Sequence, residues 1–410
     1  MKICDREKCT GCGACINICA TQCIVFEKDE YGTKYPIIDE DKCVKCGRCI
    51  KVCPNNMEYD FTIPIKTYAV WSNNQKLRAA AASGGVASEI YEYALKHKIL
   101  INGVKFQRNT GVYHFILKEN DDLLWARDSK YVFSDMEDIY KEYKEYLRIN
   151  KKCIFIGLPC QVAAIKSYLR MNCINDENLV TIELICHGTP NWEYLDKHLE
   201  NIEKKKKKNI SKVSFRDPLY LYYFRAFDKK NKRIYSAGMH EGDLYYRGFA
   251  TNLDFRENCY SCNYARKERI ADITLGDFSG LGRAKKYEWD TKKVSLVLVN
   301  TQKGKEFFDM LIDNCEMHVT EREYEEAYLA EGNHNLRKPS VKHKNRNVFL
   351  ANYVKYGDYD KAAAYALKYE IDEWNKIKNK VLIKRFVLAL IPRKMKNLVK
   401  SLMKTKVEKS

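Results

Sequence analysis

Two short cysteine runs near the start of the chain constrain it more than any other feature. They occupy residues 9–19 and 43–53, and both have the spacing C-x2-C-x2-C-x3-C. The cysteines and several residues between them recur at an offset of 34 residues, as Gly13 and Gly47 do. A repeat that preserves both the cysteines and the intervening residues predicts two equivalent halves of one small module.

This spacing is the one that holds 4Fe-4S clusters in bacterial ferredoxins. Three closely spaced thiolates can converge on one cluster, whereas the fourth cysteine of each run reaches the other cluster of the pair. We therefore expect two clusters, each bound by three cysteines of one run and one cysteine of the other. The expected ligands are Cys9, Cys12, Cys15 and Cys53 for the first cluster, and Cys43, Cys46, Cys49 and Cys19 for the second.

Zinc and disulfides are the alternative uses of these cysteines. Zinc motifs usually combine paired CxxC units, four ligands in all, across a longer loop. Here each run already contains four cysteines. Cysteines with only two residues between them rarely suit the geometry of a disulfide. Iron–sulfur clusters therefore remain the favoured interpretation of the two runs.

Length and composition favour a cytoplasmic protein with more than one core. The chain has 410 residues, which is enough for two or three domains. Its 17 cysteines fit a reducing compartment, because thiolates that bind metal must stay reduced. No stretch approaches the roughly 18–20 apolar residues of a membrane-spanning helix, and the first residues contain no apolar signal core. We therefore expect a cytoplasmic location.

The net charge of +18 suggests a nucleic-acid partner, but its distribution argues against one. Residues 376–410 contain twelve Lys or Arg and one acidic residue, and therefore supply most of the excess. No zinc-finger, homeodomain or RNA-binding signature is present, so we expect no specific nucleic-acid partner. The basic stretch 381–410, which has apolar patches among its lysines, predicts peripheral contact with the inner face of an anionic membrane. A helix packed on the body, or a frayed tail, is the alternative.

Four further cysteines lie beside predicted strands. One apolar strand leads into Cys160, and a second leads into Cys186. If both strands are parallel members of one sheet, the two cysteines meet at its carboxyl edge, where α/β proteins bind ligands. Cys259 and Cys262 come just before another predicted strand. The four cysteines predict a third 4Fe-4S cluster, with a zinc site or unrelated buried thiols as the alternatives.

Polar residues at the same edge suggest a reaction site. His187 lies beside a proposed cluster ligand and is a candidate for acid–base chemistry, although it could equally bond to the backbone. Asp277 could orient a cofactor or transfer a proton, or it could cap a turn. The turn at 83–85 precedes a helical pattern, and its N–H groups suit a phosphate or the polar edge of a cofactor ring. An ordinary turn is the alternative there.

Several short motifs occur in a characteristic order along residues 1–300. They are Ser83-Gly84-Gly85, Ser129-Lys130-Tyr131-Val132, Gly157-Leu158-Pro159-Cys160-Gln161, Cys186-His187-Gly188, Phe215-Arg216-Asp217, Cys259-x-x-Cys262 and Gly276-Asp277-Phe278. Through this set the sequence resembles the beta subunits of coenzyme F420-reducing hydrogenase and of F420-linked dehydrogenases. That family includes a hydroxymethyl-chlorophyll reductase and many bacterial members, some of them encoded with surface-polysaccharide genes.

The resemblance implies an FAD-binding α/β domain beside a 4Fe-4S cluster. It also implies which residues line the flavin or substrate pocket: Ser83, Gly84, Gly85, Ser129, Lys130, Tyr131 and Gly188. The expected fold class is α/β (α+β). The expected parts are a two-cluster ferredoxin domain over 1–60, an N-terminal α/β region of the beta-subunit type over 61–150, a catalytic flavin and iron–sulfur domain over 151–340, and a basic helical tail over 341–410.

These features together predict an iron–sulfur flavoprotein oxidoreductase. Electrons would pass from a ferredoxin or similar low-potential donor through the clusters to FAD, and then to a small two-electron acceptor. That acceptor would be a deazaflavin or another organic substrate, with surface-polysaccharide metabolism as one setting. No GxGxxG fingerprint for a nicotinamide follows a strand, which favours a ferredoxin-type donor. The alternatives are an electron-transfer subunit without its own substrate and a non-redox zinc or scaffold protein.

Overall fold

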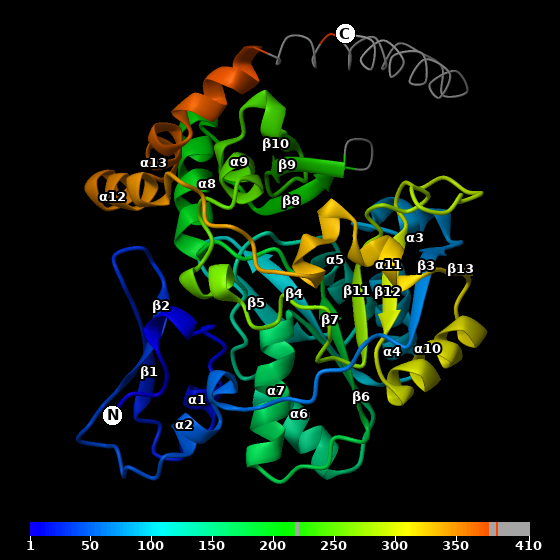
Figure 1. Cartoon of the computed structure of the whole chain (residues 1–410). Coiled ribbons are helices and arrows are strands. Elements are labelled where there is room, and N and C mark those ends of the chain that lie inside the picture. The colour runs from blue at the N-terminus through cyan, green and yellow to red at the C-terminus, as the bar shows by residue number, and fades with distance from the viewer. Residues whose placement is uncertain (218–220, 377–382, 384–410) are drawn as a thin grey trace.

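The computed structural model describes residues 1–217, 221–376 and 383, and its architecture is mixed α/β (Figure 1). A large central sheet forms the middle of the molecule, and a small N-terminal region carries the two cysteine runs. Helices gather toward the C-terminal end of the described chain. The predicted mixed α/β class, with a ferredoxin-like N-terminal region and C-terminal helices, is confirmed.

The N-terminal region contains one small unit twice. Each cysteine run enters a single helical turn, α1 (Ala14–Asn17) or α2 (Arg48–Lys51). The residues that precede these turns, Gly13 and Gly47, have positive φ angles of 78° and 72°, a conformation that glycine adopts without steric cost. Between the runs the chain forms an antiparallel hairpin. The remaining elements are η1 (Arg6–Lys8), β1 (Ile24–Lys28), β2 (Lys34–Ile38) and η2 (Pro54–Asn56).

The central sheet has eight strands, parallel in its middle and antiparallel toward both edges. In order across the sheet they are β13 (Met317–Glu321), β3 (Lys66–Ser72), β12 (Ser295–Val299), β11 (Ile273–Asp277), β7 (Leu179–Leu184), β6 (Cys153–Gly157), β4 (Leu100–Gln107) and β5 (Gly111–Ile116). Strands β11, β7, β6 and β4 are parallel to their neighbours within this group. The carboxyl ends of these four strands therefore share one edge of the sheet.

Helices pack on both faces of the central sheet. They are α4 (Val86–Lys96) and α10 (Gln302–Asn314) on one face, and α6 (Ile139–Arg148) and α7 (Pro159–Met171) on the other. Successive residues of a strand point to opposite faces. Accordingly, Ile154 and Ile156 of β6 belong to the apolar cluster of α4 and α10, whereas Cys153 and Phe155 belong to that of α6 and α7. Cys153 is therefore a buried core residue.

A second, three-stranded antiparallel sheet lies beside the later helices (Figure 1). Its members, with the helices that share their apolar cluster, are β8 (Lys212–Asp217), β9 (Leu221–Phe227), β10 (Arg233–Ala237), α8 (Trp192–Lys206), α9 (Leu244–Ala250), α12 (Arg346–Tyr356) and α13 (Tyr359–Ala366). The shorter elements of the chain are α3 (Gln75–Ala80), η3 (Asn120–Asp122), α5 (Leu123–Ala126), η4 (Met239–Glu241), η5 (Glu257–Ser261), α11 (Tyr324–Tyr328) and η6 (Glu331–Leu336). Gly357, with a φ of 59°, separates α12 from α13.

The run of five lysines at 204–208 has the composition of a solvated loop and is predicted as one, but this is wrong for its first three residues. Helix α8 continues to Lys206, and Lys207 ends it in the left-handed conformation. Leu199 and Ile202 keep one face of the helix buried to its last turns, so the lysines stay helical. Lysines are also favourable there, because the last turn of a helix carries partial negative charge.

No helix among the described residues is long and apolar enough to cross a membrane. The basic stretch over 381–410, for which we predicted contact with an anionic membrane, lies outside the described residues apart from Ile383.

A buried histidine ties α8 to the elements around it. His198 Nδ1 lies 2.6 Å from Asp360 Oδ1 of α13, and Nε2 lies 3.2 Å from Asp243 Oδ2, just before α9. Burial lowers the pKa of His198, but the two carboxylates outweigh it and raise the pKa to about 10. His198 is therefore a buried cation between two acids at neutral pH.

The first prediction concerns the pH dependence of this triad. Because the pKa of His198 rises on folding from an ordinary value of 6.5, its stabilisation is complete below that value and is lost as the pH rises through about 10. The apparent melting temperature of wild type should therefore fall more steeply between about pH 6 and about pH 9 than that of His198→Asn. The matched control is His97→Asn, at an exposed position, which should follow wild type. Parallel curves for wild type and His198→Asn would contradict the assignment.

Candidate iron–sulfur site

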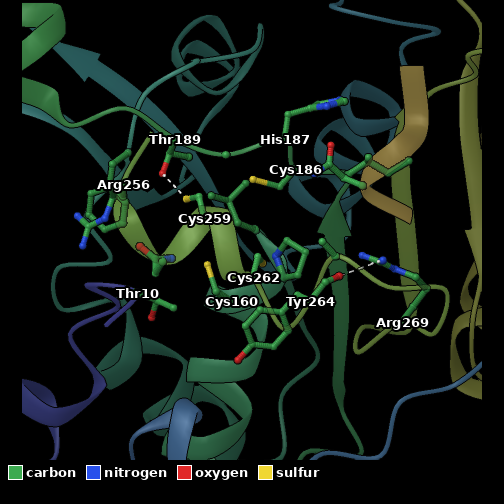
Figure 2. A pocket seen from close by; sticks show the side chains of 18 residues that line it. Thr10, Cys160, Cys186, His187, Thr189, Arg256, Cys259, Cys262, Tyr264 and Arg269 are labelled. Carbon is green, nitrogen blue, oxygen red and sulfur yellow. Dashed lines mark hydrogen bonds between the residues drawn. The ribbon is translucent and has the colours of Figure 1, made fainter. Parts of the chain in front are cut away.

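Four predicted cysteine ligands meet in one pocket at the carboxyl edge of the central sheet (Figure 2). Strands β6 and β7 pair in parallel, so the segments that follow them begin side by side. Cys160 is the second residue of α7, directly after β6, and Cys186 follows β7. Cys259 lies in η5, and Cys262 ends that turn. The structure thus brings together cysteines from three separate parts of the chain.

The surroundings of these thiols suit a buried metal centre. Burial raises the pKa of Cys160, and the nearby Cys262, Cys186 and Cys259 raise it further. Burial likewise raises the pKa of Cys262, to about 11. Four thiolates this close are unfavourable without a cation among them, and a bound metal centre removes that penalty because its thiol ligands are deprotonated. The N-terminal end of α7, which carries partial positive charge, also favours a thiolate at Cys160.

The donor set of this pocket consists of four cysteines. A 4Fe-4S cube takes its cysteines one to each iron, so four thiols around one pocket fit such a cluster. A single zinc ion also accepts four cysteine thiolates. The iron and zinc content of the purified protein therefore distinguishes the two.

A second pocket lies within the N-terminal region. It is lined by the four cysteines predicted to hold the first cluster, namely Cys9, Cys12, Cys15 and Cys53. Cys53 belongs to the second run but lies with three cysteines of the first, which is the crossed arrangement that the spacing suggests. Thr10 lines this pocket and also the pocket of Cys160, so the two cysteine sets have a common wall.

The second predicted set lies closer to the surface. Cys19 and Cys43 both contact Cys23, with 3.4 Å between the Sγ atoms of Cys19 and Cys23. Burial raises the pKa of Cys49, and the nearby Cys43 and Cys46 raise it further. Cys46 is exposed, whereas Cys49 is buried. The set therefore has one side toward solvent.

Two cysteines that sequence reasoning left unassigned lie beside these sets. Cys4 lines the pocket of the first set, and Cys23 contacts the second. Neither belongs to the C-x2-C spacing, so the pattern that found the other cysteines could not include them.

His187 lies between the pocket of Cys160 and Asp277, the last residue of β11. It lines the pocket, and its ring centroid is 5.3 Å from that of His334. Burial lowers the pKa of His187 to about 4, so the ring is neutral at pH 7. Asp277 pairs with Arg216, whose Nη2 lies 2.7 Å from Oδ2, and accepts a hydrogen bond of 3.1 Å from Tyr222. This arrangement gives a neutral imidazole beside an ion pair.

The residues assigned to the flavin by resemblance fall in different environments. Gly188 lines the pocket of Cys160. Tyr131 stacks on Phe249 at a centroid distance of 4.6 Å, and the Arg216 guanidinium lies 5.6 Å from its ring. The backbone N–H of Ser129 donates to Asp128 Oδ1. Gly188 thus follows His187 in the pocket wall, whereas Tyr131 lies beside Arg216.

Lys130 and the 83–85 turn have structural partners. Lys130 Nζ donates to the carbonyls of Trp125 at 2.6 Å and Arg127 at 2.7 Å, and so caps the end of α5. Burial lowers its pKa to about 8. Within the turn, the N–H of Gly84 donates to Ser295 and the Ser83 hydroxyl donates to the carbonyl of Val294. A Cβ at Gly84 would lie 2.3 Å from the Val70 carbonyl oxygen, and Gly85 has a φ of 97°, so close packing and backbone conformation already account for both glycines.

Comparison with known families agrees with this architecture. Residues 67–141 and 150–325 match the N-terminal and C-terminal parts of the family described as coenzyme F420 hydrogenase/dehydrogenase, beta subunit. Residues 8–57 and 35–98 match two families described as 4Fe-4S dicluster domains. The chain therefore belongs to the coenzyme F420 hydrogenase/dehydrogenase beta subunit family and carries a fused N-terminal 4Fe-4S dicluster region. It is an iron–sulfur electron-transfer protein related to an oxidoreductase subunit.

Among solved structures, a chain of the F420-reducing nickel–iron hydrogenase complex from Methanosarcina barkeri is similar to this one at 17% identity and a TM-score of 0.42. The match covers 75% of this chain and 93% of that chain. A comparison with curated proteins finds no match.

Three hydrogen bonds, two of them buried, fix the N-terminal region against the body, where α1 packs on α7 (Figure 1). The Tyr140 hydroxyl donates to the carbonyl of Cys12 at 2.7 Å, and the Ser167 hydroxyl donates to that of Val52 at 2.6 Å. The Tyr59 hydroxyl donates to the carbonyl of Ala163 at 3.1 Å. These contacts hold the first cysteine set beside the pocket of Cys160.

The second prediction tests this docking. Tyr140→Phe removes a buried hydrogen bond and leaves the Cys12 carbonyl without that donor, at a cost of about 1–2 kcal/mol. Amide hydrogen exchange over 9–19 should therefore accelerate about five- to thirtyfold in anaerobically purified protein. Tyr146→Phe, at a half-buried position of the same helix, is the matched control and should change little. Equal exchange in wild type and Tyr140→Phe would show that this bond does not hold the region.

Proposed function

We propose that the protein is an iron–sulfur flavoprotein oxidoreductase in which electrons pass from a ferredoxin-type donor through three 4Fe-4S clusters to FAD and then to a small two-electron acceptor. The observation that supports this most is the meeting of Cys160, Cys186, Cys259 and Cys262 around a pocket that shares Thr10 with the first ferredoxin-like set. A chain that carries three adjacent ligand sets can collect electrons and also use them.

In this proposal the cysteines hold the clusters as three sets. Cys9, Cys12, Cys15 and Cys53 bind the first, Cys43, Cys46, Cys49 and Cys19 the second, and Cys160, Cys186, Cys259 and Cys262 the third. A bound 4Fe-4S cluster takes up and releases one electron at a time. Around the third set, Phe133, Ile185 and Tyr264 line the pocket and limit the access of water.

The flavin site is proposed beside the third set, on the side of His187. FAD suits the last step because it accepts single electrons and delivers a hydride equivalent. Among the residues implied by the resemblance, Gly188 and Tyr131 are the best placed to contact the flavin. Ser129, Lys130 and the 83–85 turn would contact it through their backbone atoms. Neutral His187 can accept a proton, and Asp277, held by Arg216, can orient the acceptor; both roles are proposals.

The proposal divides the chain into parts by function. Residues 1–60 collect electrons, 61–150 and 151–340 build the flavin and substrate region, and 341–410 form the helical, basic end. The acceptor would be a deazaflavin or another organic molecule, which includes substrates of surface-polysaccharide metabolism. Cytoplasmic location, and peripheral membrane contact through 381–410, stay predictions.

The second candidate function is an electron-transfer subunit that has no substrate of its own. The family relationship to a subunit of an oxidoreductase favours it. Purification of the native chain under anaerobic conditions would distinguish the two. A stable complex with a catalytic partner would support the subunit, whereas an isolated chain with bound flavin would support the enzyme.

The third prediction is a cofactor count. Anaerobically purified wild type should contain about twelve irons, equal acid-labile sulfide and one FAD per chain, and little zinc. Cys160→Ser or Cys259→Ser should lower iron to about eight, because one of three cubes is lost. Cys173→Ser changes an exposed cysteine outside the three sets and is the matched control. Iron that stays unchanged in Cys160→Ser would reject the third cluster, and absence of flavin would reject the enzyme.

The fourth prediction concerns where electrons enter. Cys46 is exposed and its neighbour Val44 has 69% of its surface exposed, so we propose that the donor docks over the second set. Val44→Asp should slow reduction by reduced ferredoxin in stopped-flow absorbance measurements roughly tenfold, because a carboxylate must be desolvated on docking. Iron content should not change. Val341→Asp, at a position that is 70% exposed on the body, is the matched control. An unchanged rate in Val44→Asp would place the donor elsewhere.

A further inference from the structure

Arg256 is a buried arginine in the pocket of the third cysteine set (Figure 2). It lines the pocket of Cys160, and only 2% of its surface is exposed. On the other side it meets the first run, because a Cβ at Gly11 would lie 2.5 Å from Arg256 Nη2. Gly11 lies between Cys9 and Cys12 and lines the pocket of the first set. The guanidinium therefore lies between the first and the third sets.

The guanidinium lacks protein partners for much of its hydrogen-bonding capacity. Within the described chain, Nε and Nη2 are buried without a hydrogen-bond partner. Its contact is with an aromatic face, since Cζ lies 4.2 Å from the ring centroid of Phe133. A buried charge is costly unless an opposite charge or a hydrogen-bond acceptor compensates it. An anion is therefore expected near these nitrogens.

The backbone holds Arg256 in this position. Its N–H donates to the carbonyl of Thr189 at 2.9 Å, and its carbonyl accepts from the N–H of Cys259 at 3.0 Å. Thr189 and Cys259 both line the pocket of the third set. The side chain thus leaves from the same turn that presents a proposed ligand, so its location is fixed together with that ligand.

From this geometry we propose that Arg256 is a positioning residue that supplies a fixed positive charge between the first and third clusters and raises the reduction potentials of both. The inference rests on the proposed function, because it needs both clusters. A cube held by four thiolates is anionic and becomes more so when it gains an electron from the donor. A nearby guanidinium, which keeps its proton throughout, stabilises the reduced form. The negative charge of the clusters would in turn compensate the buried Nε and Nη2 atoms of Arg256.

The test is a redox titration of the anaerobic holoenzyme, followed by the electron paramagnetic resonance of the reduced clusters. Arg256→Gln removes the charge and should lower the equilibrium constant for reduction about tenfold in two of the three clusters, which is about 59 mV for one electron. The second cluster, at Cys46, should keep its potential. Arg256→Lys, which keeps a cation, should stay within about threefold of wild type.

Controls separate the charge from a purely structural effect. Arg247→Gln removes another buried arginine, which stacks on Trp374, and should leave all three potentials unchanged. Full iron content with unchanged potentials in Arg256→Gln would overturn the inference, as would an equal shift of all three clusters. If Arg256→Gln loses iron, Arg256→Lys becomes the test. A tenfold fall in the equilibrium constant for cluster reduction in Arg256→Lys, which keeps the cation, would overturn the role of charge. A wild type with about eight irons would instead overturn the proposed function.

Discussion

The parallel pairing of β6 with β7 is the constraint on which the rest of the candidate site depends. Its register sets Gly157 opposite Glu183, so the two strands end at the same edge of the sheet. Helix α7 begins immediately after β6, and the segment with Cys186 begins after β7. A shift by one residue would turn every side chain of a strand to the other face. It would also move Cys160 away from Cys186, which shows how strand register determines ligand geometry here.

The contacts of the N-terminal region with α6 and α7 bring the first cysteine set to this edge of the sheet. The hydroxyls of Tyr140 and Ser167 donate to backbone carbonyls of the ferredoxin-like region, and Thr10 lines both pockets. Fusion of a ferredoxin-like region to the chain would not by itself bring two cysteine sets together. Buried polar groups need hydrogen-bond partners once water is excluded. The hydrogen bonds of Tyr140 and Ser167 therefore select one docked arrangement. An electron carrier that is permanently docked avoids the cost of association at each transfer.

Local patterns allowed much of this to be predicted from sequence. The cysteine spacing predicts the N-terminal region, and apolar runs that end in Cys160 and Cys186 predict two parallel strands and a shared edge. The features that sequence reasoning missed depend on partners distant in the chain. Lys130 lies in one of the motifs that carry the family resemblance, yet its ammonium group caps α5, because carbonyls that no sequence pattern places there surround it. Cys4 and Cys23 lie outside the spacing. The run 204–208 looks solvated, but the buried face of α8 extends the helix into it.

Buried charges in this chain differ in what compensates them, and the difference bears on function. Arg269 pairs with Glu183 inside the sheet, and His198 lies between two carboxylates, so protein groups neutralise both. Such pairs fix local structure, but their charges are already neutralised and do not attract a charged ligand. Arg256 instead faces Phe133 and the two cysteine pockets, with two nitrogens left without partners in the described chain. If anionic clusters occupy those pockets, the desolvation cost of this guanidinium is offset only in the loaded protein. Cluster binding and the docked arrangement of the N-terminal region would then stabilise each other.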